Sequence, residues 1–178
     1  MGRLSVAELA DLIRDIPDFP EPGIVFKDIT PLLANADGLA STIEVLADPW
    51  RDAGLTAVVG IEARGFILGA AVAQSLGVGF VPIRKAGKLP GATMRQDYGL
   101  EYGTDTIEIH ADAVEAGDHV LVLDDVLATG GTAAAAAQLI DRLGATVAGF
   151  SFLLDLTFLD GRSKLGDARV EAAIEVNG

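Results

Sequence analysis

Residues 120–132 constrain the fold of this chain more than any other segment. They read VLVLDDVLATGGT and are followed by an alanine-rich run. The first four residues predict a buried strand, Asp124 and Asp125 are expected to end it, and Gly130 and Gly131 permit a tight turn into a helix. A continuously apolar strand followed by a helix is typical of a parallel sheet that helices cover on both faces. The segment therefore predicts an α/β fold.

The rest of the chain alternates apolar strands with helices in the same way. Strands are expected at residues 57–61, 78–83, 119–123 and 147–154 and near 170–176. Helices are expected at 6–15, 38–53, 66–76 and 131–143, and a closing helix after residue 157. Ser5 and Glu8 form a capping box that starts the first helix, and residues 24–29 read as a short extended segment closed by Pro31.

Residues 65–83 contain no charge and are long enough to be considered as a membrane span. Gln74 and Pro82 argue against a span. Gly77 and Gly79 separate a helix-like first half from a β-branched second half. We therefore expect a buried helix followed by a buried strand.

Length and composition favour one globular domain over residues 1–178. The chain has 178 residues, of which 50% are hydrophobic and 22% charged, so it can bury a core. A net charge of −13 repels nucleic acid, and we expect no nucleic-acid or membrane partner. The sequence contains no cysteine, and Arg3, Glu8 and Asp11 lie where a signal peptide would need apolar residues. A cytoplasmic location is expected.

The turn at residues 128–132 has the composition of a phosphate cradle. Free amides of the first helical turn and the hydroxyls of Thr129 and Thr132 can donate to phosphate oxygens. Asp124 and Asp125 would accept hydrogen bonds from vicinal sugar hydroxyls, so a phosphorylated sugar satisfies both parts. The spacing fits neither a Walker loop nor a dinucleotide-binding motif. The alternative is that the aspartates only cap the helix and the glycines only turn the chain.

A second cluster of charge lies in residues 84–102, which we expect to be an irregular stretch. Residues 84–95 hold four of the 13 basic residues and no acidic one. These are Arg84, Lys85, Lys88 and Arg95. The cluster is either a solvated surface loop or an anion site after a strand's carboxyl end.

Residues 120–132 resemble the phosphoribosyl-pyrophosphate signature of type I phosphoribosyltransferases. Three further segments resemble the adenine phosphoribosyltransferase family within that group. They are residues 18–31, residues 62–66, and residues 84–91 together with 100–103. The similarity spans roughly residues 18–154, in the family's order and spacing.

The resemblance implies the type I phosphoribosyltransferase fold, with a central, mostly parallel sheet flanked by helices. An N-terminal hood over residues 1–35 would hold the base, and a long flexible loop over residues 84–105 would act as a lid. The implied reaction transfers the 5-phosphoribosyl group from phosphoribosyl pyrophosphate to N9 of adenine, giving AMP and pyrophosphate. Mg²⁺ is expected to be held mainly by the substrate and water, so no protein ligand is assigned.

The resemblance also implies roles for single residues. The residues expected to hold the 5′-phosphate are Ala128, Thr129, Gly130, Gly131 and Thr132. Asp124 and Asp125 would hold the ribose hydroxyls. The residues expected near the pyrophosphate are Arg64, Arg84, Lys85 and Lys88, and Arg84 could act across the interface of an expected homodimer.

Adenine is expected between Phe26 and either Val126 or Leu127. Backbone atoms of Val25 and Lys27 would read its edge, and a 6-oxopurine would leave buried groups unpaired there.

Glu101 is the expected acid/base residue, acting near N7 of the base as negative charge develops. The alternative is an exposed residue that balances Arg95. Two other functions stay open: a phosphoribosyltransferase for another base, and a phosphoribosyl-pyrophosphate-sensing regulator.

Overall fold

The structure is a computed structural model of the 178-residue chain that describes residues 2–99 and 103–178. Two compact units divide the chain, Met1–Val45 and Leu46–Gly178. The expected single domain and the expected hood over residues 1–35 stay predictions.

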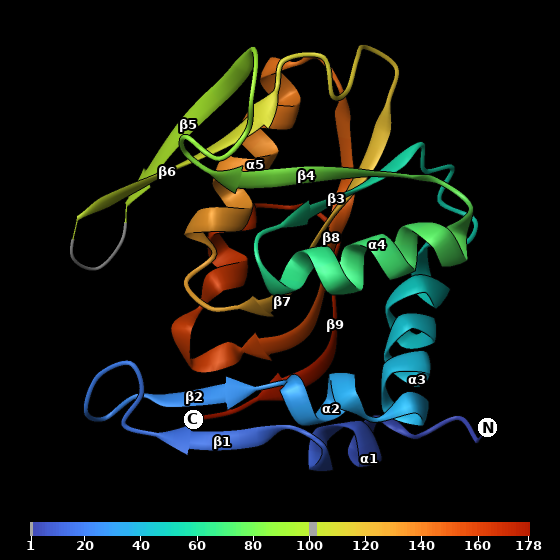
Figure 1. Ribbon diagram of the computed structural model, residues 1–178, viewed down its shortest axis with the longest axis vertical. Helices are drawn as coiled ribbons and strands as arrows, with labels where there is room; N and C mark the ends of the chain where they lie inside the picture. The colour runs from blue at the N-terminus through green and yellow to red at the C-terminus, as the bar shows by residue number, and fades with distance from the viewer. Residues whose placement is uncertain (1, 100–102) are drawn as a thin grey trace. The chain divides into compact units, whose positions relative to one another are not determined.

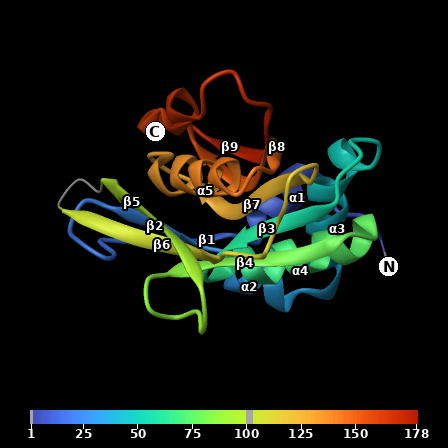
Figure 2. The same ribbon diagram turned by 90° about the horizontal axis from the view of Figure 1, so that it is seen from above.

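The larger unit is built on a seven-stranded sheet (Figures 1 and 2), in the order β5-β6-β4-β3-β7-β8-β9. The strands are β3 (Ala57–Ile61), β4 (Gly79–Lys85), β5 (Thr93–Gly99), β6 (Thr104–His110), β7 (His119–Leu127), β8 (Thr146–Leu156) and β9 (Val170–Val176). Strands β4, β3, β7, β8 and β9 run parallel, whereas β5 and β6 add an antiparallel hairpin at one edge. The predicted, mostly parallel central sheet is confirmed.

Two helices connect the central strands on opposite faces of the sheet. The helix α4 (Arg64–Leu76) links β3 to β4, and α5 (Gly131–Arg142) links β7 to β8. Figure 2 shows these helices on opposite sides of the central strands. Strands β3 and β7 are neighbours whose connections run in opposite directions along the sheet. Their carboxyl ends therefore flank a topological switch point, which is where open α/β sheets bind ligands.

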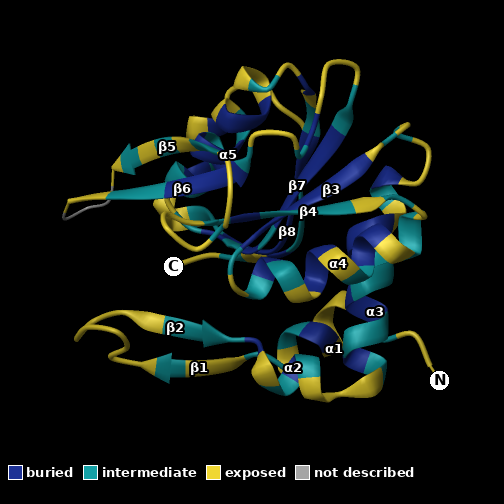
Figure 3. Cartoon of the chain, turned by 45° about the horizontal axis from the view of Figure 1, so that its top comes forward, coloured by how far each residue is buried: buried dark blue, intermediate teal, exposed yellow. Residues whose placement is uncertain are grey.

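The core of this unit holds these strand ends in place. Every residue of β3 is buried, and β3 and β7 are largely dark blue in Figure 3. Val122, Leu139 and Phe150 join β7, α5 and β8 in one cluster, and none is more than 2% exposed. Such dense packing fixes the directions in which the residues at the end of β7 point.

The smaller unit combines short helices with a two-stranded sheet. Its elements are α1 (Val6–Asp11), β1 (Arg14–Pro17), β2 (Val25–Asp28), α2 (Thr30–Ala34) and α3 (Ala36–Ala47), the last of which ends in the larger unit. The predicted capping box is confirmed, since the Glu8 amide donates to Ser5 Oγ and the Ser5 amide donates to Glu8 Oε2. β1 and β2 pair antiparallel.

Two predicted helices are shorter than expected. The first ends at Asp11, because the following residues pair with β2 and Pro17 cannot continue a helix. The second ends at Ala47, before Pro49 and a 3-10 helix, η1 (Asp48–Trp50). The closing helix predicted after residue 157 consists of two 3-10 helices, η2 (Thr157–Leu159) and η3 (Gly161–Leu165).

Two further expectations are wrong. Residues 84–102 are not irregular throughout, because β4 continues to Lys85 and β5 pairs with β6 over seven residues. The strand predicted to end at 123 continues to Leu127, since the long β8 pairs beside it to Asp155. Asp124 and Asp125 therefore lie inside β7.

The uncharged stretch at residues 65–83 forms a helix and then a strand, as predicted, because it falls in α4 and β4. The strand is less buried than predicted, since Ile83 is the one buried residue of β4. In the described part of the chain, no helix combines the length and the apolar character that a membrane span needs.

Candidate active site

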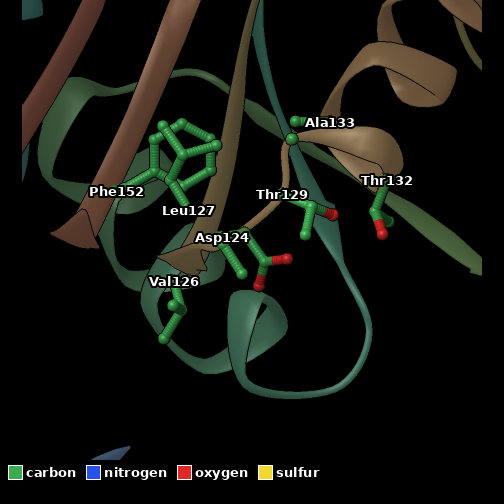
Figure 4. A pocket seen from close by; sticks show the side chains of 9 residues that line it. Asp124, Val126, Leu127, Thr129, Thr132, Ala133 and Phe152 are labelled. Carbon is green, nitrogen blue, oxygen red and sulfur yellow. The ribbon is translucent and has the colours of Figure 1, made fainter. Parts of the chain in front are cut away.

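The segment of residues 128–132, between β7 and α5, forms a cradle at the switch point. It lines a cavity of about 80 Å³. Figure 4 shows Asp124, Thr129 and Thr132 on one side of this cavity and Leu127 and Phe152 on the other. Gly130, at φ 79°, precedes α5, whose first amide N–H groups have no acceptor within a helix. These donors and the helix dipole suit a phosphate group.

The cradle is supported from behind by Gly161, a residue that the sequence analysis missed. A side chain on Gly130 would overlap the carbonyl oxygen of Gly161, and one on Gly161 would overlap the carbonyl oxygen of Ala128. The neighbouring Arg162 fixes this turn, because its Nε donates to Asp155 Oδ2 over 2.6 Å. Nothing in the local sequence around Gly161 signals this long-range approach.

The two aspartates of β7 meet the first turn of α4. The carboxylate of Asp125 forms an ion pair with Arg64 Nε, and the Asp125 side chain is 5% exposed. A Cβ atom on Gly65 would lie 2.8 Å from Asp124 Oδ1. Only glycine at position 65 therefore lets α4 approach this carboxyl group so closely.

The two carboxyl groups differ in their electrostatic surroundings. Burial, and then the neighbouring charge of Asp125, raises the pKa of Asp124 well above its usual range. Asp125 is balanced by Arg64 instead. One group that holds a proton readily beside one that accepts hydrogen bonds suits a pair of vicinal hydroxyls.

The basic residues at and after the end of β4 gather around Glu62, the first residue after β3. Arg84 Nε lies 3.2 Å from Glu62 Oε2 and Lys88 Nζ lies 2.5 Å from Glu62 Oε1. The Lys85 amide also donates to Glu62 Oε2, at 2.8 Å. Burial raises the pKa of Glu62, but the bonds from Lys88 and Lys85 and the charge of Arg84 lower it overall. Glu62 thus marks a place where an anion is bound by this basic cluster.

The other two basic side chains have different carboxylate partners. Lys85 Nζ lies 3.1 Å from Asp105 Oδ2, and Arg95 Nε lies 3.1 Å from the buried Glu108. Arg95 thus has a partner in β6, outside the Glu62 cluster. The fold brings together Arg84, Lys88 and Glu62, whereas Arg95 pairs with Glu108 and not with Glu62.

The C-terminal end of β5 lies beside the cradle. A Cβ atom on Gly131 would lie 3.4 Å from the carbonyl oxygen of Gly99 and 3.6 Å from Cδ2 of Tyr98. Glu101, the predicted acid/base residue, lies outside the described residues, and its role stays a prediction. The lid role of residues 84–105 also stays a prediction.

The residues predicted to bind adenine lie in both units. Phe26 belongs to β2 and contacts Phe19 edge to face, with 5.3 Å between the ring centroids. Val25 and Lys27 lie on the same strand, whereas Val126 and Leu127 line the cavity beside the cradle. The adenine site stays a prediction.

The carboxylates beside the cradle suit a metal that is held mostly by substrate. Mg²⁺ needs six oxygen ligands in a near-octahedral arrangement. Asp124 and Asp125 could give at most part of that set, and Asp125 is already paired with Arg64. In the described ranges, no three potential ligand side chains (His, Cys, Asp or Glu) are grouped.

The carboxylate partners of the basic residues were not predicted from the sequence; they are Glu62, Asp105 and Glu108. A signal existed for Glu108, which lies between Ile107 and Ile109 in an alternating pattern typical of a strand. The partners of Glu62 lie more than twenty positions away along the chain, so no local pattern could identify them.

Comparison with known proteins agrees with this geometry. Residues 27–169 match the family described as phosphoribosyl transferase domain. Adenine phosphoribosyltransferase from Acaryochloris marina is 58% identical over 168 residues, which cover 94% of this chain and 99% of that protein. The enzyme of that name from Streptomyces coelicolor is 58% identical over 94% of this chain and 92% of its own length.

Solved structures show the same relationship. Adenine phosphoribosyltransferase from Thermoanaerobacter pseudethanolicus matches with a TM-score of 0.95 and 49% identity, covering 97% of this chain and all of that one. A Giardia lamblia enzyme complexed with 9-deazaadenine matches with a TM-score of 0.93 and 42% identity, over 98% of this chain and 99% of that one. The chain therefore belongs to the phosphoribosyl transferase family and, within it, to the adenine phosphoribosyltransferases.

Proposed function

We propose that this chain makes AMP and pyrophosphate from adenine and phosphoribosyl pyrophosphate, as a purine-salvage enzyme. The observation that carries this function is the meeting, at one switch point, of a phosphate cradle, an acidic pair and Arg64. Each part fits one portion of a single substrate: the 5′-phosphate, the ribose hydroxyls and the diphosphate.

The proposed reaction is a displacement at C1′ of the ribose. The C1′–O bond breaks, pyrophosphate leaves with the electron pair, and N9 of adenine forms the new bond. The N9 proton passes to water or to the departing pyrophosphate. Arg64, Arg84, Lys85 and Lys88 would stabilise the negative charge that builds on the leaving group. The cradle would hold the sugar so that C1′ faces the base.

Glu101 would supply the acid/base function. A carboxyl group near N7 could donate a proton or a hydrogen bond while N9 is deprotonated. The support is the family resemblance of residues 100–103, together with the position of Gly99 beside the cradle.

Mg²⁺ completes the proposal. When bound, it would neutralise charge on the diphosphate oxygens, with the substrate and water as its main ligands and Asp124 and Asp125 close by. We further propose a homodimer and a cytoplasmic location. The support for the dimer is the family resemblance, and the support for the location is a cysteine-free sequence suited to a reducing compartment.

The test is a steady-state assay with adenine, phosphoribosyl pyrophosphate and Mg²⁺. We expect AMP and pyrophosphate to form in equal amounts, with dependence on all three components. Release of ribose 5-phosphate without AMP would contradict the transfer, because it would show hydrolysis.

A further inference from the structure

The mechanism described above leaves one fully buried carboxylate unused, that of Glu108 in β6. Its side chain has no solvent exposure. Oε1 accepts hydrogen bonds from three consecutive backbone amides, those of Gly87 at 3.0 Å, Lys88 at 3.1 Å and Leu89 at 3.0 Å. Oε2 accepts from Arg95 Nε at 3.1 Å. A buried charge is tolerated when its oxygens are satisfied in this way.

Three successive amides that converge on one oxygen form an anion-binding nest. Gly87 makes the nest possible, because its φ of 83° is a conformation that side chains disfavour. The segment of residues 87–89 is therefore folded around a carboxylate from a neighbouring strand. The pKa of Glu108 is lowered despite its burial, chiefly by the hydrogen bond from the Leu89 amide. The hydrogen bond from the Gly87 amide and the charge of Arg95 lower it further. Glu108 thus stays ionised at neutral pH.

The nest fixes the backbone from which Lys88 reaches Glu62. Glu108 is paired in register with Arg84 across β4 and β6, and Arg84 Nη1 contacts the Lys88 carbonyl oxygen at 3.5 Å. One carboxylate therefore sets the spacing between two of the cations that surround Glu62.

We propose that Glu108 is a positioning residue for diphosphate recognition: it holds residues 87–89 so that Lys88 and Arg84 present their charges to the diphosphate group. The inference rests on the proposed function, which gives these two cations a diphosphate ligand. The proposal predicts that a change at Glu108 weakens the binding of ligands that carry a diphosphate and leaves the affinity of ligands without one unchanged.

The first test is Glu108→Gln, compared with Glu171→Gln. Glu171 is a matched control, because it is a strand glutamate that accepts from an arginine Nε, on β9. The amide nitrogen of glutamine would face Arg95, donor against donor, and the charge that holds the nest would be lost. We expect the KM for phosphoribosyl pyrophosphate and the Ki of pyrophosphate each to rise about tenfold, the scale of one charge-assisted hydrogen bond.

Two ligands without a diphosphate separate positioning from a general loss of structure. The KM for adenine and the Kd of AMP should change by less than about twofold in Glu108→Gln, since neither needs the nest. Equal weakening of AMP and pyrophosphate would overturn the proposal, as would unchanged affinity for pyrophosphate. Glu171→Gln should change none of these constants.

The second test needs no measurement of activity. Amide hydrogen exchange of the wild-type chain should show protection at Gly87, Lys88 and Leu89, since a buried carboxylate accepts all three N–H groups. In Glu108→Gln the protection of these three amides should fall at least tenfold more than that of the Val122 amide in the core. Rapid exchange of the three amides in the wild type would overturn the proposal. A wild type that protects them but makes no AMP would instead count against the proposed function.

Discussion

The carboxylate of Asp125, inside β7, is paired with Nε of Arg64, the first residue of α4. The two residues are 61 positions apart in the sequence, and they meet because β3 and β7 are parallel neighbours whose carboxyl ends lie together. The ion pair joins the part of the site expected to hold ribose to the part expected to hold pyrophosphate. Loss of either partner should therefore affect both parts.

The double variant Asp124→Asn with Asp125→Asn should bind phosphoribosyl pyrophosphate more weakly by a few kcal/mol, because charge-assisted hydrogen bonds to the ribose are lost. Asp125→Asn alone should have a large part of this effect, since it also removes the ion pair between Asp125 and Arg64. Steady-state kinetics with circular dichroism as a folding control measure both. Unchanged kinetics in the double variant would remove these residues from the site.

Glu62→Gln should bind pyrophosphate more tightly than the wild type. Glu62 occupies Arg84 and Lys88 with its own negative charge, and a diphosphate has to compete with it. Removal of one charge about 4 Å away is worth roughly 1 kcal/mol in a water-like medium, so the Ki of pyrophosphate should fall about fivefold. Glu115→Gln, which removes an exposed charge, is the control. A higher Ki in Glu62→Gln would show that Glu62 holds the cations in place for the ligand.

The dependence of stability on pH should show the opposite shifts of two carboxyl groups. Hydrogen bonds from the Leu89 and Gly87 amides and the charge of Arg95 place the pKa of Glu108 below its ordinary 4.5. Its contribution to stability is present above that value and is lost as pH falls through the lower folded pKa. The contribution of Asp124 to stability changes with pH in the opposite direction. Burial raises its pKa above 3.8, so its contribution is present at low pH and is lost as pH rises.

Urea unfolding of Glu108→Gln and the wild type at several pH values tests this sign. The variant should be less stable at pH 7, and the gap in the free energy of unfolding should narrow as pH falls below about 4.5. A gap that widens in acid would mean that Glu108 is not stabilised as a carboxylate.

Local signals in the sequence predicted much of the fold, because they concern residues close together in the chain. The capping box at Ser5 and Glu8, the glycines around residue 78 and the apolar run of β3 needed no distant partner. The first helix was predicted too long because Ile16 fits a helical spacing as well as it fits the strand β1, in which it pairs with Phe26 of β2. Only tertiary pairing decides between these two structures.

The candidate site was predicted unevenly for the same reason. Its cradle and acidic pair lie within one segment, so their chemistry is visible in the sequence. The β5–β6 hairpin was missed because residues 84–102 were predicted to be irregular, with charges that fitted either a solvated loop or an anion site. In the structure, Glu108 neutralises Arg95 from the next strand. Gly161 was missed because it contacts the cradle from another part of the chain.

Glu101→Gln should lower kcat by about 10²–10⁴ and leave the affinity for phosphoribosyl pyrophosphate nearly unchanged, as expected for one general acid or base. Asp97→Asn is the control, since Asp97 accepts from Thr106 Oγ1 at 2.6 Å within the hairpin. A kcat within about threefold of the wild type would contradict the role, because that is well under 1 kcal/mol of barrier.

The most direct test of the proposed function is a competition between purine bases for one limited supply of phosphoribosyl pyrophosphate. The assay contains equal concentrations of adenine, hypoxanthine and guanine, together with Mg²⁺. The kcat/KM for adenine should exceed that for either other base by a factor on the order of 10⁴, because the wrong base leaves buried polar groups unpaired. Chromatography of the nucleotide products measures the ratio. AMP as essentially the whole product is the predicted result, and comparable amounts of IMP or GMP would contradict it.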